Sequence, residues 1–297
     1  MKIALFGRGS LIFNNGKLHF LTESLKKVEG VEICCYTPLS DHFKGAIGER
    51  CRITSFSDYK TLPADTAFFL SLGGDGTFLE SLTMVRESNI PVAGINFGRL
   101  GFLTTACVDK RNGWLEELRR GRFKIEKRTL LQIRSGCGTS IPDDFYPVAL
   151  NEITIQRNSP VMLEIEIAVN GERLPHYMAD GILIGSATGS TAYSLSIGGP
   201  IVTPDSKVLI IAPIAPHNLN VRPIIVPETA VIEISYSTRS SGALLTADNR
   251  SFPLPKGEKL IVSKADYQLS SISINNNFMK ALSQKLLWGE DKRNLLG

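Results

Sequence analysis

An apolar segment that runs directly into a glycine-rich turn constrains the fold of this chain more than any other feature. Residues 68–72 read Phe-Phe-Leu-Ser-Leu, which predicts a buried strand, and Gly-Gly-Asp-Gly-Thr follows at positions 73–77. Residues 78–85 then place apolar side chains at helical spacing. The segment therefore predicts a strand, a tight turn and a helix, the unit from which parallel α/β sheets are built.

The composition of this turn suits the binding of a polyphosphate. Gly73, Gly74 and Gly76 lack a Cβ and can adopt positive φ, so backbone N–H groups can approach phosphate oxygens closely. The N-terminus of the helix that follows, near Thr77, adds further N–H donors. Asp75 places a carboxylate beside this anion site, where it can meet a metal ion or accept a proton from an attacking hydroxyl. The turn predicts phosphoryl transfer, and the alternative is an ordinary turn in which Asp75 only caps the helix.

Length and composition bound the class of protein. With 297 residues, 43% hydrophobic and 21% charged, the chain is expected to be a soluble enzyme of two domains. The net charge of +4 does not indicate a nucleic-acid partner and is compatible with an anionic substrate. Five cysteines without a C-x-x-C pair suggest neither a disulfide framework nor a zinc site. No signal peptide and no membrane-spanning stretch is recognised, so a cytoplasmic protein without a membrane partner is expected.

Hydrophobic periodicity divides the chain into two parts of different texture. From residue 1 to about 105, apolar runs at 3–6, 31–36, 67–72 and 91–96 alternate with amphipathic stretches, which is typical of a parallel sheet covered by helices. The third glycine of a dinucleotide fingerprint begun by Gly7-Arg8-Gly9 is replaced by Ile12, which argues against a Rossmann dehydrogenase.

After about residue 125 the sequence predicts strands without helical spacers. The cleanest period-two segment is 163–169, and Asn170-Gly171 then predicts a type I′ hairpin turn. The second part is therefore expected to be mostly antiparallel β. Residues 278–288 return to helical spacing, end at Gly289, and are expected to pack on the first part.

A hydroxyl-rich tract at residues 180–194 is the second segment of unusual composition. Ser or Thr occupies five of the nine positions from Ser186 to Ser194, and Gly189 among them would let a flat ring or a ribose approach the backbone. The tract predicts nucleotide binding, and the alternative is a Ser/Thr-rich loop that bonds to its own backbone. Asn151-Glu152 offers an amide and a carboxylate to ribose hydroxyls or an adenine edge, or forms a polar turn.

Residues 96–102 follow an expected parallel strand, at the sheet edge where open α/β folds bind ligands. Arg99 in this segment is a candidate phosphate ligand, with a solvated loop arginine as the equal alternative.

Taken in order, these motifs make the chain resemble the NAD kinases, which use ATP to phosphorylate NAD to NADP. The resemblance rests on the glycine turn, residues 96–103, Leu150-Asn151-Glu152, the tract 180–200 and residues 216–223. The glycine turn alone is shared with lipid kinases and phosphofructokinases, whereas the tract 180–200 is specific to the family.

The resemblance implies an α/β plus all-β fold. A Rossmann-like domain is expected over residues 1–122, a β-sandwich domain over 123–274, and a returning C-terminal helix in 275–297. NAD is expected in the cleft between the domains, with Mg²⁺ or another divalent metal carried by ATP and no metal held by the protein alone. A homodimer or homotetramer is also expected.

The resemblance further implies roles for individual residues. Asp75 would activate the 2′-hydroxyl of the adenosine ribose for attack on the γ-phosphate of ATP, and Gly73, Gly74, Gly76, Thr77 and Arg99 would bind phosphate. The positions expected to contact NAD are Asp75, Gly76, Asn151, Glu152, Asp180, Thr191, Ala192, Tyr193, Ser194, Leu195, Ser196 and Asn249.

Three positions depart from the family pattern. Ala187 stands where proline is usual, Met178 where many members carry a basic residue, and Asp248-Asn249 where an Asp-Gly turn is usual. Two other functions compete with the main hypothesis: a lipid or sphingoid-base kinase, and a non-catalytic NAD(P)-binding sensor. The hydroxyl-rich tract favours a nucleotide over an acyl chain, and Asp75 favours catalysis over sensing.

Overall fold

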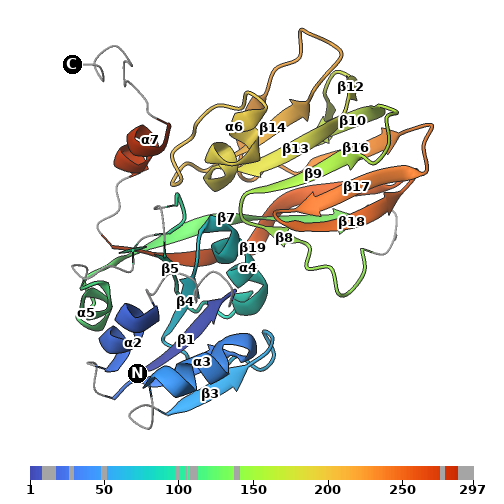
Figure 1. Cartoon of the computed structure of the whole chain (residues 1–297). Helices are drawn as coiled ribbons and strands as arrows, with labels where there is room; N and C mark the ends of the chain where they lie inside the picture. The colour runs from blue at the N-terminus through green and yellow to red at the C-terminus, as the bar shows by residue number, and fades with distance from the viewer. Residues whose placement is uncertain are drawn as a thin grey trace, which may run out of the picture. The chain divides into compact units, whose positions relative to one another are not determined.

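The chain folds as two compact units, each with a hydrophobic core of its own. The computed structural model describes residues 1–8, 18–26, 30–47, 52–97, 101–104, 106–107, 113–136, 141–274 and 278–286. Unit 1 comprises Met1–Glu126 and Ser270–Gly297, and unit 2 comprises Lys127–Leu269. The chain leaves unit 1 within β7 (Lys124–Ser135) and returns to it within β19 (Lys259–Ser273) (Figure 1).

Unit 1 is built on parallel strands in the order β5-β4-β1-β2-β3. Their bounds are β1 (Lys2–Gly7), β2 (Glu32–Tyr36), β3 (Ile53–Phe56), β4 (Phe68–Leu72) and β5 (Val92–Asn96). The short β6 (Ala106–Cys107) and the end of β19 also pair in parallel with β5. The four expected strands are confirmed, and β3 was missed because only Ile53 and Phe56 of its residues turn inward.

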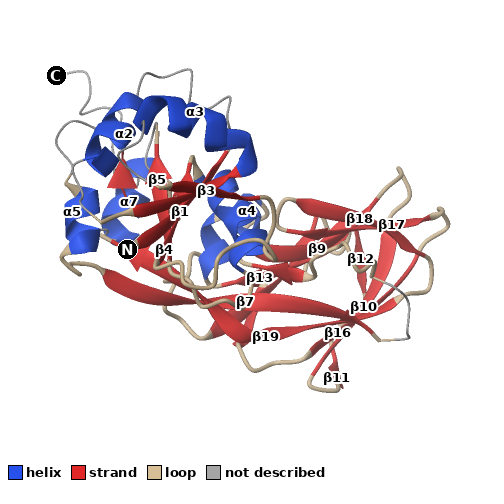
Figure 2. Cartoon of the chain, turned by 90° about the horizontal axis from the view of Figure 1, so that it is seen from below, coloured by secondary structure: helices blue, strands red, loops and turns tan. Residues whose placement is uncertain are grey.

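Helices cover both faces of these strands (Figure 2). The helices of unit 1 are α2 (Leu18–Lys26), α3 (Thr37–Ile47), α4 (Asp75–Val85), α5 (Trp114–Arg119) and α7 (Phe278–Leu286), of which the first four lie against the strands. One face, which carries Leu5 and Leu70, packs against α2, α3 and α5. The other face carries Gly94, where a Cβ would lie 3.0 Å from Phe78 of α4, so α4 covers that side. None of the described helices is long and apolar enough to cross a membrane.

Unit 2 is a sandwich of two antiparallel sheets. One contains β10 (Leu163–Val169), β11 (Glu172–Arg173), β12 (Tyr177–Ala179), β16 (Ile232–Ser237) and β19, with β7 and β8 (Val148–Ala149) paired beside β19. The other has the order β15-β14-β13-β9-β17-β18, with bounds Ile224–Pro227, Val208–Ile214, Gly181–Ser186, Glu152–Arg157, Gly242–Ala247 and Arg250–Pro255. Alternate residues of both sheets, such as Ile165 and Ile155, meet in one core. The expected α/β plus β-sandwich fold is confirmed.

The predicted type I′ turn joins β10 to β11. Asn170 has φ of 52° and Gly171 has φ of 86°, and Val169 pairs with Glu172 across the turn. The C-terminal helix α7 begins at Phe278 as expected and is described to Leu286, so Gly289 lies outside the described residues.

Phe69 gives a test of the core of unit 1. Its side chain is 0% exposed, and its ring centroid lies 5.7 Å from that of Phe6 and 6.0 Å from that of Phe56. Phe69→Ala should lower the free energy of unfolding by about 3–5 kcal/mol because it leaves a cavity among these rings. Both tryptophans belong to unit 1, so urea unfolding followed by tryptophan fluorescence reports this unit. Phe69→Leu, which keeps most of the volume, should lose less, and equal losses would contradict cavity formation as the cause.

Candidate functional site

The glycine turn joins β4 to α4 in the way that its sequence predicts. Gly73 has φ of 155°, and a Cβ there would lie 2.3 Å from Oγ1 of Thr77, so this position requires glycine. Gly73 uses the positive φ that glycine allows, whereas Gly74 has φ of −85° and Gly76 lies in the first turn of α4. A Cβ at either would meet nothing within 4 Å, so the turn is open at both positions. Gly74 is the N-cap, and its carbonyl accepts from the N–H groups of Thr77 and Phe78.

Asp75 does not cap its own helix; backbone groups of another loop hold it. The N–H of Phe102 donates to its Oδ2 at 2.8 Å and the N–H of Leu103 to its Oδ1 at 3.1 Å. A Cβ on Gly101 would lie 1.7 Å from Oδ1, so glycine is required for this approach. The side chain remains 34% exposed. The carboxylate is thus oriented while part of it stays accessible, and the capping alternative is wrong.

The segment after β5 contributes to this arrangement through its backbone. Thr104 Oγ1 accepts from the N–H of Gly101 at 2.6 Å and lies 3.4 Å from Nδ2 of the buried Asn96. This ties the loop that binds Asp75 to the end of β5. Arg99, the candidate phosphate ligand, lies outside the described residues.

Lys285 of α7 is a residue at this site that the sequence reasoning missed. Its Nζ lies 4.0 Å from Oδ2 of Asp75 and 4.3 Å from the ring centroid of Phe102. Burial lowers the pKa of Lys285, against the Asp75 carboxylate, which raises it. The available signal was the helical spacing of Phe278, Leu282 and Lys285, which puts the lysine on the same face as the apolar residues.

In unit 2, a buried carboxylate holds the turn formed by Asn151 and Glu152. Asp248, whose side chain is 0% exposed, accepts from the N–H of Leu150 at 2.8 Å, of Asn151 at 2.8 Å and of Glu152 at 3.3 Å. Its own N–H donates to the carbonyl of Glu152 at 3.0 Å. Asn249, one of the predicted NAD contacts, is exposed at the tip of the β17–β18 turn, and the sequence analysis gave no role to Asp248, which holds the Asn151-Glu152 turn.

The hydroxyl-rich tract also forms hydrogen bonds to the segment that contains this turn. Ser186 Oγ donates to the carbonyl of Leu150 at 2.5 Å and accepts from the N–H of Gly189 at 3.2 Å, while the N–H of Ser186 donates to the carbonyl of Asn151 at 2.8 Å. A Cβ on Gly189 would lie 2.1 Å from the Asn151 carbonyl oxygen. The structure therefore brings Ser186 and Gly189 of the tract to the Asn151-Glu152 turn, although these residues are more than 30 positions apart in the sequence.

The alternative of a loop that bonds to its own backbone applies to one residue of the tract. Ser190 bonds to the backbone of Val202 through its Oγ in both directions, which is a structural role. Thr191 ends the 3₁₀ turn Thr188–Thr191, Ala192 follows it, and the short helix α6 (Tyr193–Ser196) comes next. Of these residues Ser196 is exposed, Thr191, Ala192, Tyr193 and Leu195 are half-buried, and Ser194 is buried.

Glu152 and Asp248 are both carboxyls whose pKa is raised by burial. Burial, and then the nearby Asp248 carboxylate, raise the pKa of Glu152 to about 8, against a backbone hydrogen bond from Tyr193. Burial also raises the pKa of Asp248, while its three backbone donors and Arg250 act in the opposite direction. Glu152 Oε2 has no hydrogen-bond partner among the described residues, whereas both oxygens of Asp248 accept N–H groups. Of the two carboxyls, Glu152 is therefore the one expected to hold a proton at neutral pH.

Asp180 is not brought to this turn. It precedes β13, where Gly181 pairs with Gln156, whereas Glu152 pairs with Gly185 at the other end of the same ladder. Four residues of strand separate the two ends, which is roughly 13 Å. Arg157 Nε lies 2.9 Å from Oδ1 of Asp180, and the carboxylate is 31% exposed.

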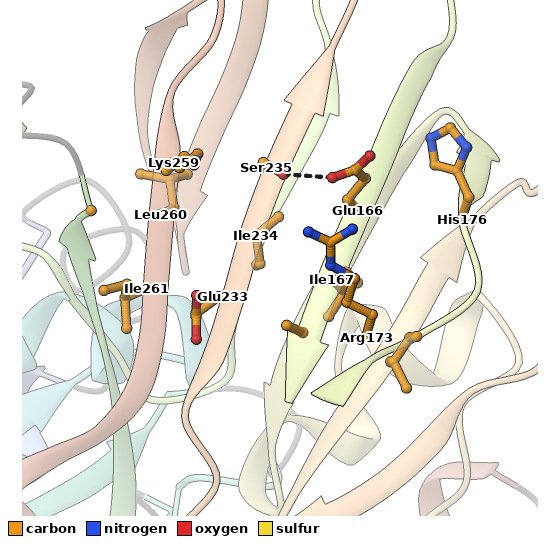
Figure 3. Close-up of a pocket in the computed structure, with 13 residues that line it drawn as sticks. Glu166, Ile167, Arg173, His176, Glu233, Ile234, Ser235, Lys259, Leu260 and Ile261 are labelled. Atoms are coloured by element: carbon orange, nitrogen blue, oxygen red, sulfur yellow. Dashed lines mark hydrogen bonds between the residues drawn. The ribbon is translucent and has the colours of Figure 1, made fainter. Parts of the chain in front are cut away.

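A cavity of about 390 Å³ lies elsewhere in unit 2, over β10, β16 and β19 (Figure 3). Charged side chains line it, among them Glu166, Arg173, Glu233 and Lys259, and Ser235 Oγ lies 3.5 Å from Glu166. No predicted site residue takes part in it. Within the described residues, no group of three or more His, Cys, Asp or Glu side chains could hold a metal ion.

Comparison with known proteins identifies the family. The model of the ATP-NAD kinase N-terminal domain matches residues 18–123, and that of the C-terminal domain matches residues 150–274. The NAD kinase of Flavobacterium psychrophilum is 43% identical over 242 residues, which is 80% of this chain and 82% of that protein. The NAD kinase of Bacteroides fragilis is 36% identical over 299 residues, 99% of this chain and 100% of that protein.

Solved structures agree in fold. Yeast NADH kinase in complex with NADH has a TM-score of 0.83 at 25% identity, covering 98% of this chain and 89% of that one. An NAD kinase from Archaeoglobus fulgidus in complex with ATP has a TM-score of 0.72 at 24% identity, covering 97% and 99%. With both domain models matched along the chain and full-length relatives above 30% identity, this chain belongs to the ATP-NAD kinase family, whose reaction is the ATP-dependent phosphorylation of NAD to NADP.

Proposed function

We propose that Asp75 is the general base of this NAD kinase. The observation that carries the proposal is the orientation of its carboxylate by two backbone N–H groups at the open glycine turn, with a third of the side chain still exposed. A base held in one orientation beside the donor phosphates loses little entropy in the transition state. Asp75 would accept the proton of the ribose 2′-hydroxyl as that oxygen forms its bond to the γ-phosphorus and the bond to the β-phosphate oxygen breaks, giving NADP and ADP.

The glycine turn would hold the polyphosphate. Gly74 and Gly76 leave the approach open, and the first N–H groups of α4 point along the helix axis toward an anion at this end. Gly73 and Thr77 shape the turn by their mutual contact. Mg²⁺ fits this donor set, because phosphate oxygens and the Asp75 carboxylate are the hard oxygen ligands it prefers, and it would neutralise charge on the transferred group. Arg99 stays a candidate for the same role.

NAD recognition is assigned to the clamped turn and the tract around it in unit 2. Asn151 and Glu152 are fixed by Asp248 on one side and by Ser186 and Gly189 on the other, so their side chains are preorganised for hydrogen bonding. The Tyr193 backbone hydrogen-bonds to Glu152, and the proposed contacts next to it in the chain are the partly exposed Thr191, Ala192, Leu195 and Ser196. Ser194 is added to them, because its buried Oγ has no partner among the described residues. Asp75, Gly76, Asp180 and Asn249 complete the proposed set of NAD contacts.

A homodimer or homotetramer is proposed as the functional state. Asp180 lies at the opposite end of β13 from Glu152, so the two would not serve the same end of one dinucleotide without either an extended ligand or a second subunit. Sedimentation velocity of the purified protein tests this, and a monomer at working concentration would contradict it.

A cytoplasmic location is proposed on the free, buried thiols of Cys34 and Cys35.

Asp75→Asn tests the general base. The variant keeps the size of the side chain and one acceptor oxygen, but its amide cannot take a proton, so kcat should fall by about 10²–10⁴ while NAD binding persists. Steady-state NADP formation from NAD and Mg-ATP measures the first, and calorimetric titration with NAD the second. Undiminished turnover would contradict the assignment. A wild-type protein that binds NAD and makes no NADP would support the non-catalytic sensor.

Glu152→Gln tests the raised pKa of Glu152. Between the unfolded value of 4.5 and the folded value of about 8, the native state binds a proton that the unfolded state has lost, so native stability falls as pH rises through this window. The free energy of unfolding of the wild type should therefore decline relative to Glu152→Gln by up to about 1.4 kcal/mol per pH unit, and level off above the window. Urea unfolding followed by circular dichroism at several pH values measures this. A constant difference would show that Glu152 is ionised in the folded protein.

Asp248→Asn tests the clamp. Replacing the carboxylate removes charge-assisted acceptance of three N–H groups, so unit 2 should lose about 2–4 kcal/mol of stability and KM for NAD should rise more than kcat falls. Asp266, whose side chain is 90% exposed in the same unit, supplies the control variant Asp266→Asn. Equal behaviour of the two variants in thermal melting and NAD kinetics would refute the positioning role.

A further inference from the structure

One face of the C-terminal helix α7 is turned toward the glycine turn. Leu282 is buried, the ring of Phe278 lies 6.3 Å from that of Phe102, and Lys285 follows one turn after Leu282. These residues occupy positions i, i+4 and i+7, which share one face of a helix. Lys280 and Met279 belong to the other side and are exposed. The apolar contacts therefore fix where the Lys285 ammonium lies.

The Lys285 ammonium lies beside the Asp75 carboxylate but does not form a hydrogen bond with it. The 4.0 Å separation from Oδ2 is an ion pair at its outer limit and too long for a hydrogen bond. Asp75 already accepts the N–H groups of Phe102 and Leu103, and the Phe102 ring lies under the lysine at 4.3 Å. No hydrogen bond joins Lys285 Nζ to any described residue. Its three N–H donors are thus available to another acceptor at this place.

Partial burial of a lysine needs a compensating anion. Only a quarter of the Lys285 side chain is exposed, and burial lowers its pKa. The Asp75 carboxylate, which is one-third exposed, therefore offsets the desolvation of the ammonium incompletely. When a polyphosphate arrives at the glycine turn, it brings further negative charge next to Asp75, and the two anions repel unless a cation lies between or beside them. Lys285 is in that position.

We propose that Lys285 is a substrate-binding residue that contacts the polyphosphate of ATP at the glycine turn, beside Asp75. The inference rests on the proposed function of that turn and adds a ligand from the far end of the chain. A lysine ammonium binds phosphate as a mobile point charge with three donors, which suits a group that changes its charge distribution during transfer. Docking of α7 thereby completes the donor site.

The test compares three variants of the full-length protein. Lys285→Met keeps an apolar stem against Phe102 and removes the charge, Lys285→Arg keeps the charge, and Lys280→Met removes a charge from the exposed side of the same helix. Lys285→Met should raise KM for ATP at least about tenfold, equivalent to roughly 1.4 kcal/mol of lost binding, with KM for NAD unchanged. Lys285→Arg should restore most of the affinity, and Lys280→Met should match the wild type.

Direct titration with ATP separates this proposal from the proposed reaction. A weaker dissociation constant for ATP in Lys285→Met supports the lysine as a ligand even if the wild type makes no NADP, a result that would refute only the reaction. Equal ATP affinity in Lys285→Met and Lys280→Met would overturn the proposal. A higher kcat in Lys285→Met would also overturn it, since Lys285 would then be an inhibitory partner of Asp75. If Lys285→Met does not fold, as judged by tryptophan fluorescence, Lys285→Gln takes its place with the same criteria.

Discussion

Acceptance of consecutive backbone N–H groups by a single carboxylate is the interaction on which both candidate sites depend. Asp248 accepts three, from Leu150 to Glu152, and Asp75 accepts two, from Phe102 and Leu103. In each case a charged acceptor satisfies amides in a loop or at the first residue of a strand. The two carboxylates differ in exposure: Asp248 is fully buried, and Asp75 is partly open. Burial makes Asp248 a support for other residues, whereas exposure leaves Asp75 able to react.

Both sites require backbone segments to approach a neighbouring side chain or carbonyl closely, and glycine permits this approach. Gly101 lets its loop reach Asp75, and Gly189 lets the hydroxyl-rich tract reach the Asn151 carbonyl. Any Cβ at these two positions would overlap its neighbour. The same residue type has a different use at Gly74 and Gly76, where open space beside the turn leaves room for a ligand. Glycine therefore contributes both the tight contacts of the site and its accessibility.

The surroundings of Glu152 and of Asp75 have opposite effects on the charge of these two carboxyls. Glu152 and Asp248 lie close together in a buried setting, and burial and the Asp248 carboxylate raise the pKa of Glu152 to about 8, which favours its neutral form. Asp75 has the opposite arrangement, with backbone donors and the Lys285 ammonium around it. The first arrangement favours a neutral hydrogen-bonding group at Glu152. The second arrangement stabilises the Asp75 carboxylate as an anion, even when the negatively charged polyphosphate of ATP binds beside it.

The sequence by itself determined the alternation of strands and helices in unit 1, the antiparallel texture of unit 2, the hairpin turn at Asn170-Gly171 and the glycine turn with Asp75, because each depends on local periodicity or on a turn that a few residues specify. It also singled out residues 151–152 and the tract 180–194 as candidates for nucleotide binding. It did not separate Asp180 from Glu152, since strand pairing sets that distance, and it gave no role to Asp248, which accepts the N–H groups of Leu150, Asn151 and Glu152. Lys285 beside Asp75 was decided only by the tertiary structure. Two residues 210 positions apart meet because Phe278 and Leu282 dock α7, and no local pattern encodes the partner of a docked helix.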